Sequence, residues 1–227
     1  MKAPAVTQQG NGAKRLAIWV CLLGLPLAYE ASTLLSGPGS FYSGNIWYWF
    51  SGFQVRIALS VIGAAVVLWA LRRSGEGLTG IGWPRRLRLW EILGIMVVLA
   101  GAVAVTLQHP AHVSTQVAFV TASTPATPLE RWALLVLAVV EALVQETIWR
   151  GALITWLEPS LGRFGAALAS AASFTFYHPG FTFNGTQLAV AALVAATYTL
   201  LFLWRRSIGP SAFLHFLLTA GQLLAPV

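Results

Sequence analysis

Long apolar runs separated by short polar breaks dominate this 227-residue chain. A bilayer core about 30 Å thick needs about 20 mostly apolar residues for each helical span. Several runs approach that length, so the pattern predicts an all-α, polytopic transmembrane helix bundle of about seven spans. The predicted spans cover residues 16–35, 46–71, 90–107, 132–157, 163–178, 188–204 and 208–224.

The N-terminal segment differs from the rest of the chain. Residues 1–13 are polar and small, which predicts a disordered leader ahead of Lys14 and Arg15. The first apolar run resembles a signal peptide, but it is long and lacks a small-x-small cleavage site near Glu30, which favours an uncleaved first helix. With no internal repeat, residues 14–227 are predicted to form a single transmembrane domain.

Composition excludes an ordinary soluble domain. Hydrophobic residues make up 57% of the chain and charged residues only 9%, where soluble domains carry about a quarter charged residues. The net charge of +7 comes from basic residues at the ends of apolar runs, so we expect the lipid bilayer and not nucleic acid as a partner. If the helices alternate, nearly all these residues face one side, which predicts a cell (inner) membrane protein with a cytoplasmic N-terminus.

Ionisable residues inside the predicted spans are few. Each costs about 2.5 to 3.5 kcal/mol at the bilayer centre on insertion scales, so each needs a partner or a function. Glu30 and Arg56 lie at similar depth on the first two spans, which predicts a structural ion pair. The others gather on three spans of the second half, where we expect the functional site. They are Glu141, Glu146, Arg150, His178 and His215.

The fourth predicted span carries polar residues at helical spacing. Glu146 and Arg150 are four residues apart in the order that favours an ion pair. Glu141 and Gln145 share another face, turned by about 100°. Gln145 forms hydrogen bonds but takes no proton near pH 7. Glu141 lies about 6 Å from it along the axis, which predicts that the two side chains do not serve the same water.

Histidines mark the fifth and seventh predicted spans. Phe174 precedes His178 by four residues at the end of the fifth span, and this pair alone also fits an interfacial aromatic belt. His215 lies within an apolar run, and Thr219 follows one turn later. A buried histidine needs partners for both ring nitrogens.

The order of these motifs resembles the CAAX prenyl protease and bacteriocin-processing (CPBP) family. That family shows Glu-Glu-x-x-x-Arg, Phe-x-x-x-His and His-x-x-x-Asn on successive helices. The resemblance covers residues 130–224. The counterparts here are Gln145, Glu146 and Arg150, then Phe174 and His178, then His215 and Thr219.

The resemblance implies an intramembrane endopeptidase without a cofactor, acting on a membrane-anchored or lipidated peptide or protein. In the family, the residue at position 145 and His178 activate a water, while His215 and the side chain at position 219 stabilise the oxyanion. Glu146 belongs to the same catalytic motif, and it and Arg150 hold the helix, with Phe174 as further structural support.

Two positions depart from the family pattern. Gln145 replaces a glutamate and Thr219 replaces an asparagine. Glutamine keeps the shape of glutamate but cannot act as a base, which predicts a slow or inactive enzyme that Gln145→Glu would activate.

Other functions fit parts of the pattern. A non-catalytic relative would use the same cavity as a membrane scaffold or peptide-binding protein. A small transporter would use the charged cluster for proton coupling, although paired broken helices in repeated halves are lacking. His178, His215 and Glu146 would also make a two-histidine, one-carboxylate set for zinc or iron.

Overall fold

The computed structural model describes residues 8–36, 46–84, 112–114, 123–125, 128–178 and 185–224. In the first half, α1 (Gln8–Trp19), the π-helical segment η1 (Val20–Gly24) and α2 (Leu25–Ser36) follow one another without a break. A second long helix, α3 (Ile46–Ser74), is followed by the 3-10 turn η2 (Leu78–Ile81).

Two short strands precede the helices of the second half. β1 (His112–Ser114) pairs antiparallel with β2 (Ser123–Pro125). The helices are α5 (Pro128–Glu146), the π-helical η3 (Thr147–Ile154), α6 (Thr155–Tyr177), α7 (Gly185–Arg205) and α8 (Ile208–Leu224). The predicted all-α class is confirmed for this part of the chain.

Among the described residues, three helices are long and apolar enough to cross a membrane. They cover Gly10–Ser32, Val55–Ser74 and Leu188–Arg205, and a shorter apolar helix covers Ile208–Ala220. The span predicted at 90–107 lies outside the described residues. The count of seven spans therefore stays a prediction.

Several predicted helix boundaries agree with the structure. The last predicted span, 208–224, coincides with α8. The predicted break between 157 and 163 falls inside α6, where Gly162 has φ 68° and ψ 170°. This left-handed backbone is one that glycine adopts at little cost, so the chain turns there.

The predicted leader is shorter than expected. Residues 8–13 are helical, because α1 begins at Gln8. Gly10 is buried, and a Cβ built on it would lie 2.9 Å from the Cα of Ser74 at the end of α3. This close packing orders the segment despite its polar sequence. Residues 1–7 lie outside the described residues.

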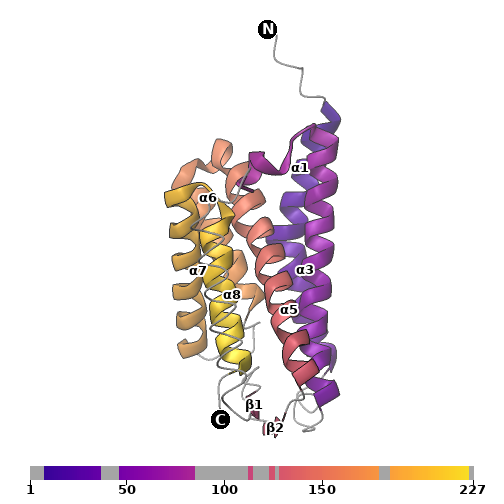
Figure 1. Ribbon diagram of the computed structural model, residues 1–227. Helices are drawn as coiled ribbons and strands as arrows, with labels where there is room; N and C mark the ends of the chain where they lie inside the picture. The colour runs from indigo at the N-terminus through magenta and orange to yellow at the C-terminus, as the bar shows by residue number, and fades with distance from the viewer. Residues whose placement is uncertain are drawn as a thin grey trace.

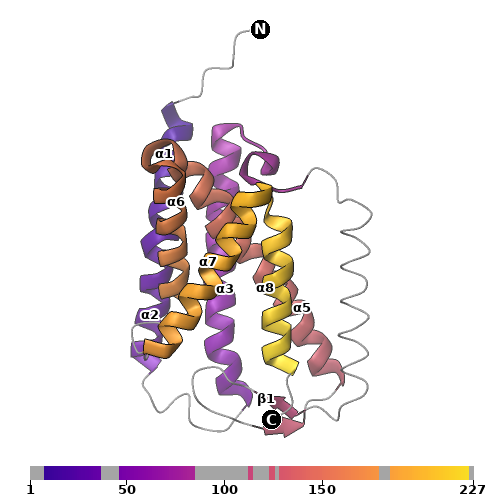
Figure 2. The same cartoon turned by 90° about the vertical axis from the view of Figure 1, so that its left-hand side faces the viewer.

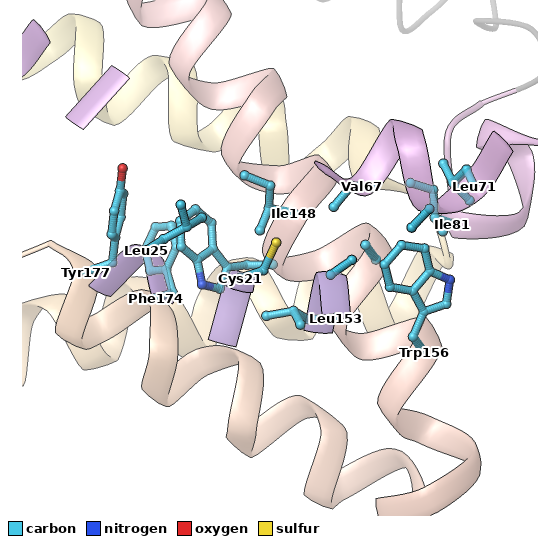
Figure 3. Close-up of a cluster of buried hydrophobic side chains, with 14 of the residues drawn as sticks. Cys21, Leu25, Val67, Leu71, Ile81, Ile148, Leu153, Trp156, Phe174 and Tyr177 are labelled. Carbon is cyan, nitrogen blue, oxygen red and sulfur yellow. The ribbon is translucent and has the colours of Figure 1, made fainter. Parts of the chain in front are cut away.

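The helices form a bundle around a continuous apolar core. α1 and α2 pack on α3, α5 packs on α8, and α7 lies against both α6 and α8 (Figures 1 and 2). α2 also contacts α6, which joins the two halves of the chain. In the core, Cys21 and Leu25 from the first half lie beside Ile148 and Phe174 from the second (Figure 3).

Charged residues at one end of the bundle connect distant segments. Lys14 pairs with Glu76, just beyond the basic end of α3. Arg206 pairs with Glu158 at 2.6 Å. The backbone N–H of Ile208 donates to the carbonyl of Gly82 at 3.0 Å. The turn after α3 and the turn between α7 and α8 therefore meet at this end.

We expect Gly151→Ala to destabilise the protein by about 1 to 3 kcal/mol, the usual cost of overpacking. A Cβ at Gly151 would lie 2.7 Å from the carbonyl oxygen of Ile81, a fully buried residue whose backbone has little room to move. Chemical unfolding in detergent measures the change. Gly12→Ala is the matched control, because nothing lies within 4 Å of a Cβ there. Equal stabilities for both variants would contradict the prediction.

Candidate functional site

Two residues of α3 face two residues of α5 at the same spacing. Arg56 Nη2 lies 2.8 Å from Glu141 Oε1. One turn further along both helices, Gln145 Nε2 donates to Ser60 Oγ at 3.3 Å. Gln145 Nε2 also donates to Glu141 Oε1 at 3.0 Å. The result is a four-residue polar cluster, called here the Glu141 cluster (Arg56, Ser60, Glu141 and Gln145).

The side chains of Glu141 and Gln145 are closer together than their separation along the helix axis indicates. Their backbone positions are separated by one turn, but helical side chains lean toward the N-terminal end of the helix. The side chain of Gln145 therefore reaches back to Glu141, and the gap between their polar atoms closes to 3.0 Å.

Tyr177 connects the Glu141 cluster to the end of α6. Its hydroxyl lies 2.9 Å from Ser60 Oγ and donates to the carbonyl of Arg56 at 2.6 Å. Its ring lies 5.8 Å from that of His178, measured between centroids. The Glu141 cluster is thus linked through Ser60 and Tyr177 to the neighbourhood of His178.

Glu146 holds two partners from different helices. Its Oε1 accepts from Arg150 Nη1 at 3.1 Å and lies 3.0 Å from His215 Nδ1. The predicted Glu146–Arg150 pair is confirmed. Because an ionised carboxylate only accepts, His215 Nδ1 carries a hydrogen in this bond. Glu146 therefore fixes the orientation of the imidazole.

Arg150 is fully buried and has contacts on all sides. Its Nη2 donates to the carbonyl of Ala195 on α7 at 3.1 Å. Its guanidinium lies 3.9 Å from the centroid of Phe174 and 5.1 Å from that of Tyr198. One arginine thus joins η3, α6 and α7, which agrees with the structural role that the resemblance implies.

His178 lies at the C-terminal end of α6, where carbonyl groups lack helical partners. Its Nδ1 lies 3.0 Å from the carbonyl oxygen of Phe174. A carbonyl only accepts, so Nδ1 is the protonated nitrogen in this bond and Nε2 of the neutral ring is left as an acceptor. This nitrogen is suited to take a hydrogen bond or a proton from a water.

The two histidines face the same aromatic side chain. Their ring centroids are 6.1 Å apart. Phe174 lies 4.0 Å from His178 and 5.7 Å from His215, and Tyr198 stacks on His215 at 4.9 Å. Residues on α6 and α8 that are far apart in sequence are therefore brought together around Phe174.

Thr219 and Glu30 are the remaining polar residues for which the sequence predicts a role. Thr219 is half-buried one turn beyond His215, on the same face of α8. Arg56 pairs with Glu141, and the predicted pair between Glu30 and Arg56 stays a prediction.

A zinc or iron site would require His178, His215 and Glu146 to converge on one metal ion. In the described part of the chain, no group of three or more histidine, cysteine, aspartate or glutamate side chains is placed to hold a metal ion. Glu146 instead directs the same oxygen to Arg150 and His215.

Sequence reasoning missed four contributors to this region. Ser60, Tyr177 and Tyr198 are ordinary span residues by periodicity, and only the packing of separate helices reveals their partners. The π-helical geometry of Thr147–Ile154 also escaped prediction, although all eight residues are buried directly after Glu146. Short π-helical segments are frequent at functional sites.

Comparison with known proteins gives one match. Residues 127–221 match the family model described as "Type II CAAX prenyl endopeptidase Rce1-like", which confirms the resemblance of the second half to CAAX-processing proteases. No curated protein and no solved structure matches the chain. Together with the apolar helices of the described residues, this match indicates an integral membrane protein whose residues 127–221 are similar to CAAX-processing proteases.

Proposed function

We propose that this chain, whose residues 127–221 match the Rce1-like type II CAAX prenyl endopeptidase family model, hydrolyses a peptide bond in a membrane-anchored or lipidated substrate. The observation that carries the proposal is the pair of histidines 6.1 Å apart, each with Nδ1 engaged. Both rings thereby keep Nε2 for a reacting group.

The two rings have different partners and therefore different roles. His178 is bonded to a neutral carbonyl, so its Nε2 accepts a hydrogen bond from the attacking water. His215 is bonded to the carboxylate of Glu146, and when the ring is protonated its Nε2–H donates to the oxyanion. Thr219 adds a hydroxyl donor beside His215. Gln145 orients the water but does not take its proton.

The lipid-facing surface favours a substrate that is itself attached to the membrane. Large apolar side chains on α6 and α7, such as Leu168 and Leu193, are 72% and 69% exposed, and a soluble peptide would gain nothing from them. The substrate must be anchored in the bilayer and must present a peptide bond to the site. A peptide with a prenylated C-terminal Cys-a-a-X sequence does both, because its lipid partitions into the bilayer and its peptide bond lies near the surface.

The end of the bundle that carries Arg72, Arg73 and Arg206 is assigned to the cytoplasm in this proposal. These arginines are exposed, and the positive-inside rule favours this orientation. The N-terminus of α1 lies at the same end, since Lys14 pairs with Glu76.

The test uses the full chain in proteoliposomes with a farnesylated Cys-a-a-X peptide, and mass spectrometry of the released tripeptide. Both His178→Ala and His215→Ala are expected to lower the cleavage rate by about 10²-fold or more, because misplacing the attacking water and losing an oxyanion donor each cost about that much. Thr197→Ala, an exposed position on α7, is the control and should leave the rate unchanged.

Two outcomes would contradict the proposal. If both histidine variants cleave as fast as the original chain, the histidine pair is not the reaction centre. If the peptide binds but is never cleaved, by any variant, the chain is a peptide-binding relative and not a peptidase.

A further inference from the structure

Two buried oxygen atoms in the Glu141 cluster have no hydrogen-bond partner among the described residues. They are Oε2 of Glu141 and Oε1 of Gln145. Glu141 is 1% exposed and Gln145 is fully buried. Buried polar atoms are nearly always hydrogen-bonded, so two unpartnered acceptors on touching side chains indicate a place for a donor.

The chemistry of that donor follows from the orientation of the Gln145 amide. Glu141 Oε1 forms an ion pair with Arg56, with 2.8 Å between it and Nη2. Only the nitrogen of Gln145 can donate to it, so the amide oxygen is turned away from that bond. Both open positions are therefore acceptors, and a water molecule supplies two hydrogens for them.

We propose that Glu141 is the general base of this enzyme and that Gln145 orients the water from which it takes a proton. The inference rests on the proposed peptidase function and deepens it. The carboxylate has moved by one helical turn from the position where the family carries it. The amide at position 145 keeps the water in register between Glu141 and the reaction centre.

Hydrogen bonds connect Glu141 to Tyr177, the residue that precedes His178. Gln145 bonds Ser60 at 3.3 Å, and Ser60 lies 2.9 Å from the hydroxyl of Tyr177. Tyr177 precedes His178, whose ring faces His215. Since Ser60 belongs to α3, the first half of the chain positions the site of the matched second half.

The reaction is an ordinary hydrolysis with all atoms accounted for. The water oxygen forms a bond to the carbonyl carbon, one water proton passes to Glu141 Oε2, and the carbonyl π pair moves onto oxygen. That oxyanion then re-forms the C=O bond as the C–N bond breaks. The leaving nitrogen keeps the bond pair and receives the proton from Glu141. The products are a carboxylic acid and an amine, and Glu141 is again ionised.

Four forms of the full chain in proteoliposomes test the inference with the farnesylated peptide. They are the original chain, Glu141→Gln, Gln145→Glu, and the exchange variant with both changes. The exchange variant keeps the net charge and the pair of side-chain shapes.

The original chain should cleave slowly, and Glu141→Gln should lower its rate by about 10²-fold. The exchange variant should recover at least the original rate, because it again has one carboxylate beside one amide.

A pH profile separates a base from a mere partner of Arg56. Acid should lower the activity of both forms by protonating Nε2 of His178, but only the original chain should lose further activity through protonation of Glu141, so the acidic limb of Glu141→Gln should be shallower. This readout applies to whatever fraction of each variant folds. An acidic limb that persists unchanged in Glu141→Gln overturns the inference.

Other outcomes overturn it in distinguishable ways. An unchanged rate for Glu141→Gln shows that Glu141 is not the base. If the original chain is inactive while Gln145→Glu cleaves, the peptidase function stands and the inference fails. An exchange variant as slow as Glu141→Gln assigns Glu141 to structural support. If no variant cleaves, the proposed function fails together with the inference.

Discussion

Replacing Gln145 with glutamate is expected to raise the cleavage rate by about 10²-fold. General-base catalysis contributes about 10² to 10⁴ in rate, and glutamine at this position contributes none of it. The gain should lie at the low end because Glu141, 3.0 Å away, already supplies part of the effect. The measurement is the initial rate of tripeptide release from the farnesylated peptide in proteoliposomes.

The controls for Gln145→Glu address both the residue and its partner. Gln145→Ala removes the amide without adding a base and should be slower than the original chain. Adding His178→Ala to Gln145→Glu should abolish the gain, since both side chains act on one water. A rate that Gln145→Glu leaves unchanged would show that position 145 does not limit the reaction. Indifference to His178→Ala would contradict the shared water.

Arg150→Ala is expected to lower the free energy of unfolding by about 3 to 5 kcal/mol. Removing one partner of a buried ion pair leaves the other charge uncompensated, and that is the usual cost. The substitution also removes the hydrogen bond from Arg150 to the carbonyl of Ala195. It removes the guanidinium that lies 3.9 Å from the centroid of the Phe174 ring as well. Denaturant unfolding in detergent measures the change.

Two variants show whether this effect belongs to the buried network. Arg72→Ala removes an exposed arginine at the end of α3 and should change stability by no more than about 0.5 kcal/mol. Arg150→Lys keeps the charge but lacks the planar fork that reaches both Glu146 and Ala195, so an intermediate loss is expected. A loss for Arg150→Ala no greater than for Arg72→Ala would show that the pair is solvated.

The length of apolar runs predicts much of this fold, because a membrane-spanning helix is apolar over about 20 residues whether it faces lipid or protein. The boundaries at 46 and at 208–224 were found from the run lengths alone. The predicted break between 157 and 163 contains Gly162, where the helical backbone is interrupted. The two π-helical segments were not predictable, since one extra residue per turn leaves no signature in an apolar sequence.

For the candidate site, pairs within one helix were predictable and contacts between helices were not. The spacing of Glu146 and Arg150 indicated their ion pair, and that of Glu141 and Gln145 indicated a shared face. The partner of Arg56 depends on which helix packs beside α3. That is Glu141 on α5, and no periodic pattern in either sequence segment determines it.

The contact between Ser173 and the first helix joins segments that are synthesised far apart in time. Its hydroxyl donates to the carbonyl of Leu22 at 2.8 Å and approaches that of Cys21 at 3.3 Å, both in the π-helical segment of the first helix. The donor emerges from the ribosome about 150 residues later than these carbonyls. If the first helix inserts before α6, these two carbonyls lack the Ser173 donor until α6 packs beside them.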